Sequence, residues 1–127
     1  MLPPVKDDDP RSVRVLVLSS DPLASALLGA AIELAGYAPD FPHTSEPARV
    51  ALLRARPRLV VVDCDNEEGC SDAFVGPALM TGSRVLLFRS RRTKRDATEL
   101  STRLGLRVAE MPMDHGAFSR LLHGMLD

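Results

Sequence analysis

Residues 59–62 form an unbroken apolar run, Leu-Val-Val-Val, that leads directly into Asp63. Three of these four side chains are β-branched, which favours an extended strand buried on both faces, as in a parallel sheet. A carboxylate at the carboxyl end of a central parallel strand lies where open α/β sheets bind ligands. The simpler alternative is that Asp63 only turns the chain where the strand ends.

Strand-like and helix-like segments alternate along the rest of the chain. Further strands are predicted at residues 13–18, 37–41, 85–88 and 106–111, and Pro39 indicates that the second of these is an edge strand. Helices are predicted between them at residues 22–34, from Thr44 or Ser45 to Ala55, at residues 72–80 and 93–104, and from Asp114 to Met125, although Gly76-Pro77 interrupts the third. Five strands alternating with five helices predict an α/β fold with a parallel sheet covered on both faces.

Capping residues mark where several of these helices begin. Asp21 is a good N-cap for the first helix, Thr44 or Ser45 for the second, and Thr93 with Asp96 has the spacing of a capping box for the fourth. Apolar residues that recur at helical spacing predict the packed face of the first helix: Leu23, Leu27, Ala30, Ala31 and Leu34.

Composition places the chain among globular proteins. With 127 residues, 45% of them hydrophobic, it is predicted to form one domain at residues 12–127 behind a disordered leader at residues 1–11. The net charge of -1 favours no class of partner, and no apolar run is long enough to cross a membrane. Without a secretory signal, and with Cys64 and Cys70 too few for a disulfide framework, a cytoplasmic location is expected.

Three segments resemble the receiver domain of response regulators. They are residues 15–22, which match the first strand and its acidic turn, residues 57–63, which match the strand that delivers the phosphoacceptor aspartate, and residues 111–114, which match the turn after the fifth strand. The resemblance extends over residues 13–126. It implies a flavodoxin-like, three-layer (βα)5 fold with a five-stranded parallel sheet in the order 2-1-3-4-5.

The resemblance also implies a phosphorylation site, in which Asp63 matches the phosphoacceptor. The two acids that hold Mg²⁺ in the family are replaced by Ser19 and Ser20, with Asp21 one position too late. Neutral hydroxyls are weak ligands for a cation that gives up its water reluctantly, so Mg²⁺ binding is expected to be lost or weak. The family's lysine is replaced by Met111, which cannot pair with a phosphoryl oxygen.

Two further positions follow from the same match. The family's hydroxyl residue after the fourth strand falls on Arg89, or on Ser90 if the match slips by one residue. An Arg89 guanidinium could form a charge-assisted pair with Asp63 in place of a phosphoryl group, or could point to solvent. Pro112 keeps the proline of the family's turn, and a cis bond before it is therefore predicted.

Charged residues cluster in two places. Five acids between residues 63 and 72 form either a cation site or, as the favoured interpretation, a solvated loop. Residues 84–107 hold eight Arg or Lys residues against two acids. We expect this segment to supply an interaction face, with these residues on it: Arg91, Arg92, Lys94, Arg95, Arg103 and Arg107.

The hypothesis that follows is a degenerate receiver, or pseudo-receiver, that signals by phosphorylation-independent contact with a protein partner or an output domain. It is not expected to be an enzyme. A homodimer through the fourth helix, fifth strand and fifth helix is predicted. The first alternative is a working phosphoacceptor receiver of a two-component system that uses Asp63. The second is nucleic-acid binding through the basic segment at residues 84–107, which is disfavoured because its only aromatic residue, Phe88, belongs to a strand.

Overall fold

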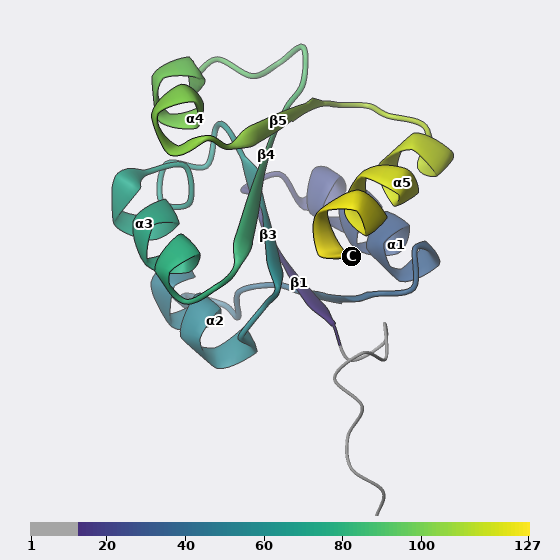
Figure 1. Cartoon of the computed structure of the whole chain (residues 1–127), viewed down its shortest axis with the longest axis horizontal. Helices are drawn as coiled ribbons and strands as arrows, with labels where there is room; N and C mark the ends of the chain where they lie inside the picture. The colour runs from purple at the N-terminus through teal and green to yellow at the C-terminus, as the bar shows by residue number, and fades with distance from the viewer. Residues whose placement is uncertain (1–12) are drawn as a thin grey trace, which may run out of the picture.

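The computed structural model describes residues 13–127, so the leader predicted at residues 1–11 and the domain's first residue lie outside the described part. Five parallel strands form one sheet in the order β2-β1-β3-β4-β5 (Figure 1). The strands are β1 (Arg14–Leu18), β2 (Ala38–Asp40), β3 (Leu59–Asp63), β4 (Arg84–Arg89) and β5 (Arg107–Glu110). This confirms the predicted flavodoxin-like α/β fold, including β2 as an edge strand.

The helices cover both faces of the sheet and complete three layers. Figure 1 shows α1 (Pro22–Leu34) and α5 (His115–Leu126) on one face, and α2 (Ala48–Ala55), α3 (Asp72–Met80) and α4 (Thr98–Leu104) on the other. Each face has its own hydrophobic cluster, with the sheet between them. Among residues 13–127, no helix is both long and apolar enough to cross a membrane.

The central position of β3 follows from its sequence. Leu59 and Val61 pack into the cluster beneath α1 and α5, while Val60 and Val62 pack into the cluster beneath α2, α3 and α4. All four side chains are fully buried, and burying one such side chain contributes roughly 1.5–3 kcal/mol. The strand pairs with β1 on one side and β4 on the other, so Asp63 is delivered to the middle of the sheet's carboxyl edge.

The buried face of α1 is not the predicted one. Leu23, Leu27 and Leu34 are 67%, 63% and 73% exposed, while Leu28 and Ile32 are buried against the sheet. The helix is apolar on nearly every side, so spacing alone cannot select the face that packs. The stripe of Leu23, Leu27 and Leu34 therefore remains at the surface.

Two predicted helix starts are also wrong. Helix α2 begins at Ala48 with no side-chain cap, so neither Thr44 nor Ser45 caps it. Helix α4 begins at Thr98, because Thr93 Oγ1 accepts the Ser90 N–H at 2.8 Å within a preceding turn. Such local bonds compete with helix formation.

Helix α3 continues through Pro77 despite the predicted interruption. Proline removes the hydrogen bond to the carbonyl four residues earlier, on Ala73. Ala73 is exposed, so water can satisfy this carbonyl and the helix stays continuous.

Candidate functional site

Asp63 lies half-buried at the carboxyl end of β3, and both of its carboxylate oxygens accept hydrogen bonds from the chain. The Ser19 hydroxyl donates to Oδ2 at 3.0 Å, and the backbone N–H of Asp65 donates to Oδ1 at 2.9 Å. Bonds to an ionised carboxylate are stronger than bonds between neutral groups. The aspartate is therefore satisfied by its own neighbours.

The two serines after β1 bridge the β1–α1 turn to the loop after β3. Besides its bond to Asp63, Ser19 Oγ accepts the Asp21 N–H at 3.2 Å. Ser20 Oγ accepts a longer bond, 3.4 Å, from the Asn66 side-chain amide. Carboxylates at both serine positions would repel Asp63 in the absence of a cation, whereas hydroxyls join the two loops directly.

Asp21 caps α1, as its sequence position predicted. One oxygen accepts the backbone N–H groups of Leu23 and Ala24 at 3.0 and 3.4 Å. This bond directs the carboxylate toward the first turn of the helix. Within residues 13–127, no three Asp, Glu, His or Cys side chains are grouped so that they could hold a metal ion. Mg²⁺ prefers several oxygen ligands including carboxylates, and the two positions after β1 supply hydroxyls here.

Arg89 does not pair with Asp63, contrary to the bond considered for it. Its Nε lies 3.6 Å from Glu110 Oε1 on the neighbouring strand. Successive strand residues point to opposite faces: Arg89 follows Leu87 toward the α4 side, whereas Asp63 follows Val61 toward the α1 and α5 side. Ser90, one residue later, lines the same pocket as Asp63. The slipped match, with Ser90 as the hydroxyl residue, is the one that the geometry supports.

Met111 and Pro112 lie in the turn between β5 and α5. The peptide bond between them is cis, as predicted. Met111 is partly buried and packs against the hydrophobic cluster beneath α1 and α5, and it lines the pocket next to Asp63. A thioether therefore stands where the family resemblance implies an ammonium group.

Asp65 has a role that the sequence did not reveal. Its carboxylate accepts the backbone N–H of Lys94 at 3.0 Å and that of Arg95 at 2.9 Å. These bonds fasten the loop after β3 to the basic loop at residues 91–95. The partners are about 30 positions apart in sequence, so no local pattern marks them.

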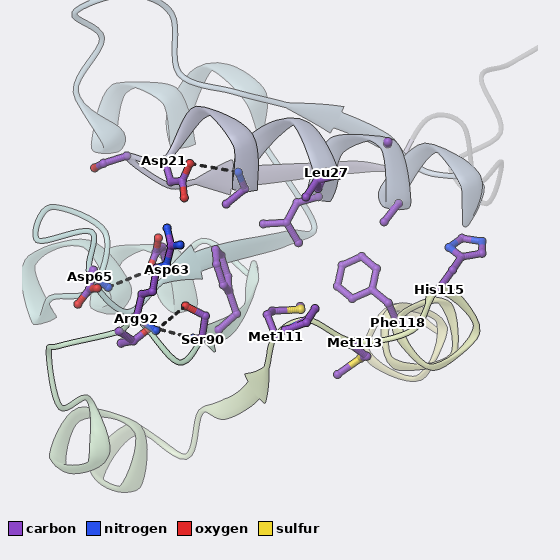
Figure 2. Close-up of a pocket in the computed structure, with 18 of the residues that line it drawn as sticks. Asp21, Leu27, Asp63, Asp65, Ser90, Arg92, Met111, Met113, His115 and Phe118 are labelled. Atoms are coloured by element: carbon purple, nitrogen blue, oxygen red, sulfur yellow. Dashed lines mark hydrogen bonds between the residues drawn. The ribbon is translucent and has the colours of Figure 1, made fainter.

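An apolar groove of about 720 Å³ runs from this site between α1 and α5. Figure 2 shows the labelled carboxylates, Ser90 and Arg92 at one end, the labelled leucine and methionines farther along, and His115 at the other end. Its partly buried methionines, Met111 and Met113, belong to the β5–α5 turn. The sequence signal for this groove is that α1 is apolar nearly all round, with Glu33 as its one charged residue.

The basic residues of the segment at residues 84–107 are divided between the amino and carboxyl ends of the strands. Arg84 and Arg107 begin β4 and β5, whereas the loop at residues 91–95 follows β4 at the carboxyl edge. Arg103 is already paired, with Nη1 at 2.7 Å from Asp72 Oδ1. Its hydrogen bonds lower the pKa of Asp72. The positive charges of residues 84–107 thus do not form one continuous patch.

The two cysteines lie in the loop after β3, and both are buried free thiols. The hydrogen bond between them, together with burial, raises the pKa of Cys64. The same bond lowers the pKa of Cys70 to about 7, with a further contribution from the positive charge of Arg95. Both side chains fill the cluster on the α2, α3 and α4 side of the sheet.

The fold is that of response-regulator receiver domains. The chain is 18% identical to a receiver protein from Burkholderia phymatum, with 90% of this chain and 94% of that one covered and a TM-score of 0.71. The chain is 16% identical to the chemotaxis protein CheY4 of Vibrio cholerae, with 90% of this chain and 98% of that one covered and a TM-score of 0.68. It is 20% identical to the receiver domain in the beryllofluoride-activated NtrC4 dimer, with 89% of this chain and 95% of that one covered and a TM-score of 0.70. No protein-family model and no curated protein sequence matches the chain.

Proposed function

We propose that this chain is a receiver-like signalling module that acts by protein contact without phosphorylation of Asp63. The observation that carries the proposal is that the chain already supplies a hydrogen bond to each carboxylate oxygen of the aspartate. Ser19 and the Asp65 backbone N–H each occupy one carboxylate oxygen. A phosphoryl donor would have to displace the Ser19 bond, and the two positions after β1 supply hydroxyls in place of the acidic pair that brings in a divalent cation.

The charge balance of the site supports the same conclusion. Phosphoryl transfer develops negative charge on the transferred oxygens, and this charge is usually neutralised by metal ions and cationic side chains. Here Ser19 and Ser20 supply no formal charge to recruit a metal, and Met111 supplies no positive charge to the phosphoryl oxygens. Arg92 is the one cationic residue among those that line the pocket, and it is exposed on a loop.

In this proposal, the surface that contacts the partner forms without phosphorylation of Asp63. Asp65 fastens the loop that carries Arg91, Arg92, Lys94 and Arg95 to the end of β3 through two backbone bonds. The basic loop is thereby ordered by an unmodified carboxylate. An acidic protein partner in the cytoplasm fits this loop, because opposite charges steer association and select partners.

A homodimer through α4, β5 and α5 is a second way for such a module to act. Val108 on β5 is 37% exposed among the charged residues Arg107 and Glu110, so this face mixes apolar and charged surface. The receiver domain of NtrC4, whose fold this chain shares, forms a dimer in its beryllofluoride-activated state. The predicted dimer of the present chain would form without such activation.

The test is a titration with Mg²⁺ and beryllofluoride, a mimic of the phosphoryl group, followed by amide NMR. We expect no saturable shifts at Asp63, Ser90 or the loop at residues 91–95. The matched positive control is a triple variant, Ser19→Asp with Ser20→Asp and Met111→Lys, in which Ser90 already supplies the hydroxyl. Saturable shifts in the unmodified protein would contradict the proposal and favour a working phosphoacceptor.

One observation favours the phosphoacceptor alternative: Asp63 and Ser90 line the same groove, as a carboxylate and a hydroxyl at neighbouring strand ends. No comparable observation favours nucleic-acid binding. Phosphate backbones select a continuous basic surface, whereas Arg84 and Arg107 lie at the opposite edge of the sheet from the loop at residues 91–95. Salt-dependent DNA binding would revive that alternative.

A further inference from the structure

We propose that the groove between α1 and α5 binds a small amphipathic molecule with an apolar body and a cationic head. The inference goes beyond the proposed function and does not depend on it, because it needs only the unmodified chain. Its basis is one cavity with two chemically different ends, together with an apolar helix face that the fold leaves uncovered.

The size and depth of the groove suit a small molecule. Its volume of about 720 Å³ falls within the range of roughly 300–1,000 Å³ that is usual for such sites. Buried aromatic and aliphatic side chains, Leu28, Phe88 and Phe118, lie at its base. Leu27 and Leu34, both largely exposed, form its rim on α1.

Small residues on α1 explain why the space is open. Ala24, Ala30 and Ala31 line the groove, so this helix fills little of the volume between itself and α5. Met111 and Met113 form the wall across from it (Figure 2). Methionine side chains are flexible and polarizable, and they adapt to ligands of differing shape. An alkyl or aryl body therefore finds apolar contacts at the base of the groove, along both walls and at its leucine rim.

Among the residues that line the end of the groove at the sheet's carboxyl edge, negative charges outnumber positive ones. Asp21, Asp63 and Asp65 line this end, opposed by the single guanidinium of Arg92. Their hydrogen bonds come from backbone N–H groups and from Ser19. No salt bridge to these three carboxylates occurs among residues 13–127, so an incoming cation meets no competing ion pair.

This distribution of charge selects the head group. A protonated amine at the mouth is attracted by three carboxylates and repelled by one guanidinium. A carboxylate there is repelled by the three carboxylates and attracted by the one guanidinium. Like charges placed together suppress the wrong partner, and complementary charges favour the right one. The chemical class of the ligand is thus a monocationic amphiphile, such as a long-chain or aryl-alkyl amine.

The experiment is displacement of the neutral dye N-phenyl-1-naphthylamine from the full chain by decylamine, decanol and decanoate below their micelle concentrations. Decylamine should displace the dye at concentrations about tenfold lower than decanoate, because the partly exposed charges act together at the mouth. Decanol should fall between them. Equal displacement by all three, or displacement without saturation, would overturn the assignment.

Matched variants locate the site. Leu27→Gln, at the rim, should weaken decylamine about fivefold through lost apolar contact. Leu23→Gln should leave it unchanged, because Leu23 is equally exposed on the same helix but does not line the groove. Asp63→Asn should weaken decylamine about two- to fivefold and spare decanol. Arg92→Gln should strengthen decylamine, with Arg91→Gln, outside the groove, as its control.

Two other occupants give distinct results. If sedimentation shows a dimer that excludes the dye, and Leu27→Gln yields monomers, the groove is a self-association surface and the ligand assignment is wrong. If Leu23→Gln and Leu27→Gln weaken binding equally, the amphiphiles coat the apolar face of α1 without a defined site, which also refutes it. Circular dichroism of each variant checks that the substitution leaves the fold intact.

Discussion

Replacing Ser19 by Ala removes a hydroxyl that donates to Asp63 Oδ2 at 3.0 Å and accepts the Asp21 N–H at 3.2 Å. A bond to a charged group contributes about 1.5–3 kcal/mol and a bond between neutral groups about 0.5–1.5 kcal/mol. Ser19 and Asp63 are both half-buried, so water replaces part of what is lost and the lower ends apply. We expect the free energy of unfolding to fall by about 2 kcal/mol.

The neighbouring serine provides the control. Ser20 is exposed and accepts one bond at 3.4 Å, so Ser20→Ala should cost less than about 0.5 kcal/mol. Urea unfolding followed by circular dichroism measures both variants. For a domain of this size, the Ser19→Ala loss corresponds to a fall in Tm of about 8 °C.

The opposite substitution tests the electrostatic part of the reasoning. Ser19→Asp places a second carboxylate against Asp63, so it should destabilise the protein in chelator, by more than Ser19→Ala. Added Mg²⁺ should recover part of that loss, because a divalent cation neutralises the pair. If Ser19→Ala is as mild as Ser20→Ala, or Ser19→Asp is neutral in chelator, then Ser19 does not close the site around Asp63.

Three further predictions concern other parts of the molecule. Asp65→Ala should accelerate amide hydrogen exchange in the loop at residues 91–95, because two backbone N–H groups lose their acceptor. Glu46→Gln should make the free energy of unfolding fall less steeply as the pH is lowered. Hydrogen bonding to Arg54 lowers the pKa of Glu46 to about 2. The stabilisation by Glu46 is therefore present above the ordinary carboxyl pKa and is lost as the pH falls toward 2. Val108→Asp should shift any homodimer to monomer in sedimentation velocity, by burying a charge in the predicted interface.

Each of these has a result that would contradict it. Glu67 lies in the same loop as Asp65 and its side chain bonds to nothing within residues 13–127, so equal exchange in Glu67→Ala would point to a general effect of charge. An unchanged acid slope in Glu46→Gln would mean that the bond to Arg54 does not persist in solution. Monomer alone for the unmodified chain at high micromolar concentration would refute the dimer.

The fold could be predicted because its strands leave few alternatives. Four consecutive apolar residues, buried on both faces, require helices on both sides of the sheet, and Asp63 necessarily follows at the strand end. The cap at Asp21 was equally visible, since the carboxylate and the amides it accepts lie within three residues. Local chemistry was sufficient in both cases.

The errors arose where a choice depends on distant parts of the chain. On α1, the stripe through Leu23 and Leu27 competes with one through Leu28 and Ile32, and only packing against the sheet and α5 selects the second. Gly29 belongs to the buried face because an added Cβ would lie 2.8 Å from the Phe41 ring. The spacing of apolar residues along the helix cannot predict that contact with Phe41.

The sequence left the hydroxyl position open between Arg89 and Ser90. A shift of one position along a strand moves a side chain to the opposite face, and the position of the last strand residue is the hardest to fix from sequence. The structure pairs Arg89 with Glu110 and brings Ser90 to the groove. The bonds of Asp65 to Lys94 and Arg95 connect separate loops, so they too required the fold.

The most direct measurement of the central claim is incubation of the unmodified chain with acetyl phosphate and Mg²⁺, read by intact mass. With Ser19 bonded to Asp63 and Met111 in place of a cation, we expect no gain of a phosphoryl group, in either the native chain or Asp63→Asn. The triple variant Ser19→Asp, Ser20→Asp and Met111→Lys serves as the positive control. A phosphoryl group on the native chain that is absent from Asp63→Asn would contradict the claim and establish Asp63 as a working phosphoacceptor.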